Sequence, residues 1–147
     1  MKMIFSVPDS DPVMTVPAQY LSVTLEDLDL RATRRVYEGY DEGFTSLARY
    51  FNELATDWRG WNGSRYYESI EGDLRIQATH DGHVNLRVLL RESAVSTGWC
   101  VEAELRLDAG EALNAAAADI AHLVRARSDL RTSMPPRVRG PAKGRAR

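Results

Sequence analysis

The chain has 147 residues, of which 44% are hydrophobic and 27% are charged, as in an ordinary soluble globular protein of one domain. No apolar run approaches the roughly 20 residues that a membrane-spanning helix needs, and the first nine residues lack the apolar core of a secretory signal. The only cysteine, Cys100, cannot close an intrachain disulfide, which is typical of the reducing cytosol. We therefore expect a cytoplasmic protein.

Charge is distributed unevenly, although the formal net charge is only −2. Five basic residues and no acidic ones follow Thr132, which leaves 14 basic and 21 acidic residues in positions 1–131, a net charge of −7. Pro135-Pro136 and Gly140-Pro141 break regular structure in the tail. We expect one acidic domain over residues 1–127 and a disordered, basic Pro/Gly-rich tail over residues 128–147. That tail is either a solubilising terminus or a weak contact for nucleic acid or for the acidic body.

Two strands are predicted near the N-terminus. Apolar residues alternate at odd positions over 21–25 and at even positions over 28–32. A tight turn at Glu26-Asp27 would switch the parity, pairing Leu25 with Leu28 and Val23 with Leu30. A bulge within one long strand would switch it as well.

A helix is predicted over residues 41–59, because apolar residues recur there at steps of three and four. They are Phe44, Leu47, Ala48, Phe51, Leu54, Ala55 and Trp58. The following Gly60 is then the left-handed residue past the helix end, and Trp61 packs back near Ala55 or Thr56. Asn62-Gly63 makes the turn into the next strand.

The next strands have alternating apolar residues over 74–78, 84–90 and 99–107, preceded by a short strand at Tyr66–Ile70. Period two with one apolar face indicates a half-buried antiparallel sheet. A two-residue turn at Asp81-Gly82 would place Ile76 on the same face as Arg87. A three-residue loop, His80–Gly82, with Gly82 left-handed, instead pairs Ala78 with Val84, and we prefer it.

A second helix is predicted over residues 109–127, with Asp108 as its cap and Glu111 reaching back. The order strands, helix, strands, helix predicts an α+β fold. We expect one antiparallel sheet of about five to six strands with both helices packed on one face.

Catalytic patterns are weak. His80 and His83, with Glu71 or Asp73, could hold a metal, but the predicted register places His80 in the turn and His83 on the outer strand face. His122 lies beside the apolar stripe of the second predicted helix, where a partly buried structural histidine is expected, and Asp119-Ile120-Ala121-His122 is not a metalloprotease pattern. Cys100 lies in a strand rather than at a helix start. No nucleophile elbow, phosphate loop or dinucleotide motif is present. We expect no enzyme, no cofactor and no metal.

A binding surface is the remaining candidate. On the outer face of the predicted sheet Arg75 and Arg87 lie beside Glu102 and Glu104, which describes either a solvated face or a polar protein-binding surface. Trp61, between two glycines, is a further candidate contact if it is exposed.

Several motifs carry a family resemblance over residues 20–125. They are Trp58-Arg59-Gly60-Trp61-x-Gly63, Ser69-Ile70-Glu71-Gly72-Asp73-Leu74, Ala78-Thr79-His80-Asp81-Gly82-His83-Val84 and Leu107-Asp108-Ala109-Gly110-Glu111-x-Leu113. Together they resemble an uncharacterised family of small actinobacterial proteins and, more distantly, immunity proteins of the WapI type. The immunity family tends to carry an Asp-Gln pair where this chain has Leu107–Gly110.

The resemblance implies a non-catalytic cytosolic protein that neutralises a toxin domain by protein–protein contact. An acidic body suits a basic partner such as a nuclease. The alternatives are a small metal-dependent enzyme that uses His80 and His83, and nucleic-acid contact through the tail.

Overall fold

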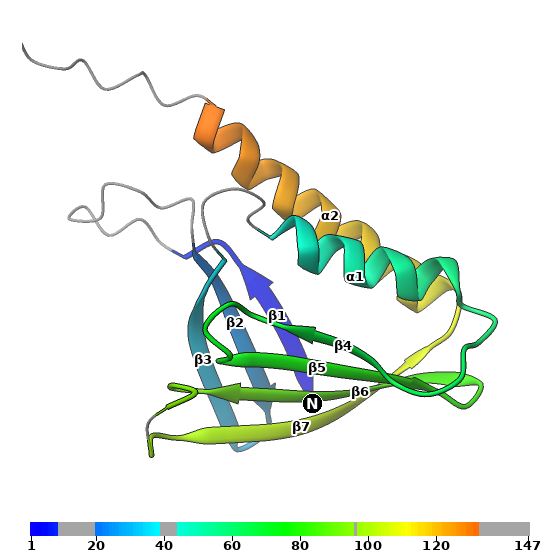
Figure 1. Ribbon diagram of the computed structural model, residues 1–147, viewed down its shortest axis with the longest axis horizontal. Helices are drawn as coiled ribbons and strands as arrows, with labels where there is room; N and C mark the ends of the chain where they lie inside the picture. The colour runs from blue at the N-terminus through cyan, green and yellow to red at the C-terminus, as the bar shows by residue number, and fades with distance from the viewer. Residues whose placement is uncertain (9–19, 39–43, 96, 133–147) are drawn as a thin grey trace, which may run out of the picture.

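The computed structural model describes residues 1–8, 20–38, 44–95 and 97–132, and this part of the chain forms strands and two helices (Figure 1). In chain order they are β1 (Lys2–Ser6), β2 (Tyr20–Asp27), β3 (Leu30–Tyr37), α1 (Thr45–Thr56), β4 (Arg65–Glu68), β5 (Leu74–His80), β6 (His83–Arg91), β7 (Cys100–Asp108) and α2 (Glu111–Thr132). The predicted α+β class and the order strands, helix, strands, helix are confirmed.

The strands form two antiparallel sheets, so the predicted single sheet of five to six strands is wrong. β1, β2 and β3 make a three-stranded sheet, and β4, β5, β6 and β7 make a four-stranded sheet in sequence order. Figure 1 shows the strands of one sheet running across those of the other. The alternation of apolar residues identifies the buried face of a strand but not its neighbours, and both sheets alternate in the same way.

The core lies where both sheets and both helices meet. Phe51 of α1 packs edge-on against Phe5 of β1, with ring centroids 6.3 Å apart. On the same helix Tyr50 lies 5.9 Å from the ring of Tyr67 in β4. Helix α1 therefore contacts both sheets rather than one face of a single sheet, and α2 lies beside it (Figure 1).

Hairpin β2–β3 turns later than predicted. Asp27 pairs with Leu30, so the turn is Leu28-Asp29, and Leu25 faces Ala32 rather than Leu28. Asp27 Oδ1 accepts the Leu28 N–H at 2.9 Å, a local bond that favours a turn. The Leu28 side chain is consequently 98% exposed. As predicted, the inward-facing positions change from odd-numbered in β2 to even-numbered in β3, but the register of the pair is displaced by four residues.

Hairpin β5–β6 keeps the predicted faces with a register displaced by two residues. Ala78 pairs with Leu86 and His80 with Val84, so the three-residue loop is Asp81–His83 rather than His80–Gly82. Asp81 Oδ1 accepts the His83 N–H at 3.1 Å and closes the loop. Gly82 has the predicted positive φ, +99°.

The helix ends also differ from prediction. Helix α1 ends at Thr56, three residues early, so Trp58 leaves the apolar stripe and is 43% exposed. Helix α2 begins at Glu111, which leaves Asp108 in β7 instead of at the cap, and it continues five residues past the predicted domain boundary at 127. The tail beyond Thr132 lies outside the described residues, as do positions 41–43 of the predicted first helix.

Candidate functional site

The four-stranded sheet has an outer face that no other described element covers (Figure 1). Alternate residues point to this face because strands β5 and β6 bury their even-numbered side chains and β7 its odd-numbered ones. Its side chains are Tyr66, Glu68, Arg75, Gln77, Thr79, Asn85, Arg87, Leu89, Glu102, Glu104 and Arg106. We call this set the outer face.

Arg87 lies at the centre of the outer face and bridges two glutamates of β7. Its Nε lies 3.2 Å from Glu102 Oε1 and its Nη2 lies 3.2 Å from Glu104 Oε1. On the same face, at the β4 edge of the sheet, Arg75 Nε lies 3.0 Å from Glu68 Oε1. Four residues predicted from the sequence therefore share one surface. Because three arginines and three glutamates balance there, the negative charge of the body is not concentrated on this face.

Two adjoining depressions hollow the outer face, with volumes of about 520 Å³ and 470 Å³. Gln77 and Arg87 line both, so they form the ridge between them. The first depression is about equally polar and apolar and includes Arg106, whereas the second is more apolar because Tyr66 and Leu89 contribute to it. A shallow surface with apolar and charged parts suits a protein partner better than a buried small ligand.

Trp61 lies apart from the outer face. Its ring centroid is 5.0 Å from that of His80 in an edge-on arrangement, and the guanidinium of Arg65 lies 4.7 Å above it. It is half-buried against the core, with its Nε1 buried and without a hydrogen-bond partner. Its ring thus contacts the end of β5, a contact that the sequence did not predict.

The side chains of His80 and His83 contact different partners. His80 Nδ1 accepts the Gly82 N–H at 3.1 Å, so its Nε2–H donates to the Trp58 carbonyl at 2.8 Å. His83 Nδ1 lies 2.6 Å from Arg106 Nη2, and its Nε2 lies 3.5 Å from Asp108 Oδ1. Within the described ranges no three potential metal-binding side chains gather. These contacts do not support a metal site shared by the two histidines.

The two other residues considered for catalysis, Cys100 and His122, are both exposed. Cys100 is exposed at the start of β7 opposite Arg91, and its thiol is free. His122 lies on the exposed side of α2 rather than partly buried as its position beside the apolar stripe predicted.

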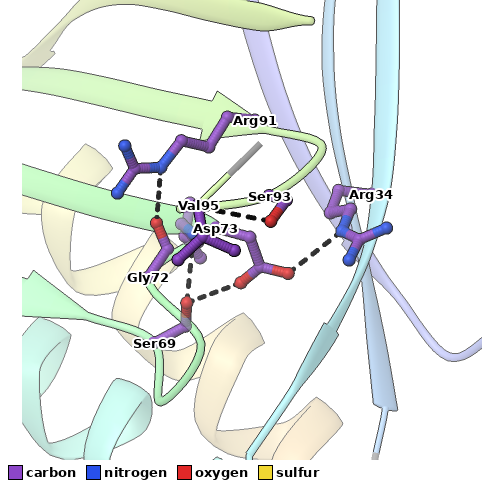
Figure 2. Close-up of polar contacts among 8 residues, drawn as sticks. Arg34, Ser69, Gly72, Asp73, Arg91, Ser93 and Val95 are labelled. Carbon is purple, nitrogen blue, oxygen red and sulfur yellow. Dashed lines mark hydrogen bonds and ion pairs between the residues drawn. The ribbon is translucent and has the colours of Figure 1, made fainter. Parts of the chain in front are cut away.

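A buried polar cluster joins the two sheets, and the sequence did not reveal it (Figure 2). Asp73, 1% exposed, accepts a bond from Arg34 Nε of β3 at 3.0 Å and another from Ser69 Oγ at 2.6 Å. Ser69 Oγ in turn accepts the Leu74 N–H at 3.1 Å. One signal was present: Arg34 occupies an inward-facing position of β3, between Ala32 and Val36, where an unpaired charge would be costly.

A second buried carboxylate, Glu38, directly follows β3 and is 5% exposed. The Tyr67 hydroxyl donates to its Oε1, and the Ser46 hydroxyl donates to its Oε2 at 3.2 Å. Burial raises the pKa of Glu38 above its usual range, and the two hydroxyl bonds oppose this rise only in part. Burial also raises the pKa of Tyr67 and of Tyr50 far above neutrality, so both remain protonated donors.

These features define a small α+β protein with two crossed antiparallel sheets, a helix pair and one open, charged sheet face. The chain belongs to a family of unknown function, DUF6228, which it matches over residues 11–127. Neither the curated proteins nor the solved structures contain a match. Among the described residues no helix is long and apolar enough to cross a membrane.

Proposed function

We propose that this protein is a non-catalytic binding protein of the cytoplasm, an immunity protein that neutralises a toxin domain through its outer face. The observation that supports the proposal is that the open face unites Arg75, Arg87, Glu102 and Glu104 around two depressions. The resemblance to WapI-type immunity proteins and to small actinobacterial proteins is part of this proposal.

The geometry suits a protein partner for two reasons. The side chains of these ion pairs are between about half and three-quarters exposed, so each pair contributes at most about 1 kcal/mol to folding and can be exchanged for a partner's charges at low cost. The depression beside Tyr66 and Leu89 accepts an apolar side chain at the centre of such a contact. Charge pairing then supplies specificity.

The partner is a basic protein such as a nuclease domain. Positions 1–131 have a net charge of −7, and long-range attraction accelerates the capture of a cationic partner. Because the outer face itself is balanced, this attraction arises from the whole body and the face selects the partner by its pattern of pairs.

Co-expression with the toxin domain encoded by the neighbouring gene tests the proposal. Wild-type protein should restore growth and form a complex that purifies intact. Arg87→Glu should weaken that complex by at least tenfold, because the introduced carboxylate would lie beside Glu102 and Glu104 and the three negative charges would repel one another. Arg49→Glu, on the exposed side of α1, is the matched control and should leave the affinity unchanged. Failure of the wild-type protein to rescue growth or to bind would contradict the proposal.

A further inference from the structure

Apolar side chains are exposed at one end of the four-stranded sheet. Ile70 in the β4–β5 turn is 65% exposed, and Val95 and Trp99 in the β6–β7 connection are 96% and 39% exposed. In an antiparallel sheet of this order both connections lie at the same end. They also touch: Arg91 Nε donates to the Gly72 carbonyl at 2.8 Å, and a Cβ built on Gly72 would lie 3.3 Å from Ala94 Cβ.

The buried cluster holds this end in place (Figure 2). Asp73 ties the β4–β5 turn to Arg34 of the other sheet, and its carbonyl accepts the Arg91 N–H at 3.0 Å. A further backbone bond joins Glu92 N–H to the Trp99 carbonyl at 3.0 Å. The turn therefore presents Ile70 outward from a fixed backbone. Fixing a contact residue before binding removes part of the entropic cost of association.

The exposed charged side chains next to these apolar residues are acidic. Glu71 adjoins Ile70, and Glu92 follows the end of β6, and both are exposed. Two cations lie nearby. Arg34 forms an ion pair with the buried Asp73, and Arg91 is half-buried and binds the Gly72 carbonyl. An apolar centre with an acidic border is complementary to an apolar pocket bordered by lysine or arginine side chains.

We propose that Ile70, Glu71, Glu92, Val95 and Trp99 form a second docking surface, the loop-end surface, for a basic protein partner. The apolar side chains enter an apolar pocket of that partner, and Glu71 and Glu92 pair with its basic border. The inference rests on the proposed function for the class of partner, but it assigns contact to a surface other than the outer face.

The test measures the affinity of the full-length protein for the toxin domain of the neighbouring gene. Ile70→Ser and Val95→Ser should each weaken binding roughly tenfold, the usual effect of losing a central apolar contact. Glu71→Lys should slow association and reduce its dependence on salt. Leu28→Ser, in the exposed β2–β3 turn, and Glu53→Lys, on α1, are the matched controls and should bind as wild type does.

The outcomes separate the two proposals. If wild-type protein binds and the three loop-end variants bind equally well, this inference is overturned and the outer face remains the proposed site. Absence of any wild-type complex overturns the proposed function and the inference with it. Sedimentation of the protein alone is the second readout: self-association that Ile70→Ser abolishes would show that a second copy covers the surface, which also overturns the inference.

Discussion

Glu38 is a buried carboxylate whose ionisation should depend on the fold. Its pKa is raised above the ordinary 4.5 by burial, so the folded state binds its proton more tightly than the unfolded state does. The stabilisation is complete below about pH 4.5 and is lost as the pH rises through the folded pKa. Glu38→Gln cannot lose a proton and should not show this loss.

Urea unfolding at pH 4.5 and pH 7.5 checks this expectation. Relative to Glu38→Gln, the wild-type protein should lose stability between these pH values, by an amount on the order of 1 kcal/mol, as is usual for one buried polar group. Tyr67→Phe, which removes the donor to Glu38 Oε1, should increase the loss. A difference between wild type and Glu38→Gln that grows in favour of wild type at higher pH would refute the prediction.

Arg34 and Asp73 should respond unequally to substitution. Asp73 is 1% exposed while the Arg34 side chain is 32% exposed, so removing the arginine leaves a buried charge without a cation. Arg34→Ala should therefore cost about 3 kcal/mol of unfolding free energy. Asp73→Asn keeps an oxygen for Ser69 and leaves a charge that water can reach, so it should cost about 1–2 kcal/mol. Chemical denaturation of both variants measures the two losses of unfolding free energy, and equal losses would contradict this prediction.

At the scale of elements, the end of α1 is joined to the β5–β6 hairpin through the stretch that begins at Trp58. Gly60 has a φ of +137°, which only glycine adopts without strain, and a Cβ there would lie 3.4 Å from His80 Nδ1. Gly63 has a φ of +77° with no atom within 4 Å of the added Cβ.

Gly60→Ala should therefore destabilise the protein more than Gly63→Ala, by about 2 kcal/mol against about 1 kcal/mol. Thermal unfolding of the two variants is the measurement. His80→Ala separates strain from contact: if most of the cost at Gly60 is backbone strain, as we expect, the cost of Gly60→Ala persists in the His80→Ala background. Equal effects at both glycines would be inconsistent with this account.

Periodicity predicted both helices, every described strand except β1, and most of the buried side chains, because burial of one face acts on every residue of an element. It could not set the hairpin registers, since shifts of two or four residues leave every side chain on the same face. It could not divide the strands between two sheets either. The outer face followed from alternation, which is why Arg87, Glu102 and Glu104 were found. The Arg34–Asp73 pair joins residues 39 positions apart and needs the packing of both sheets.

At the scale of the whole molecule, both sheets share one core. Buried residues of β2, including Val23, belong to the same cluster as Leu86 of β6 and Leu113 of α2. A single shared core predicts one cooperative unfolding transition, although the strands form two sheets. Tryptophan fluorescence reports on the α1–β5 junction through Trp61, and far-UV circular dichroism reports on all elements, so the two probes should give coincident urea curves.

Substitutions in the two sheets provide the decisive comparison. Val23→Ala removes two buried methyl groups from the three-stranded sheet, and Leu86→Ala removes a larger buried side chain from the four-stranded sheet. They should cost about 1–2 and 2–4 kcal/mol respectively. In each variant both probes should shift together, because unfolding either sheet exposes the apolar face of the other. A Val23→Ala variant whose circular dichroism changes before its fluorescence would mean that the three-stranded sheet unfolds alone. The outer face, which belongs to the other sheet, would then remain intact under those conditions and could still bind a partner.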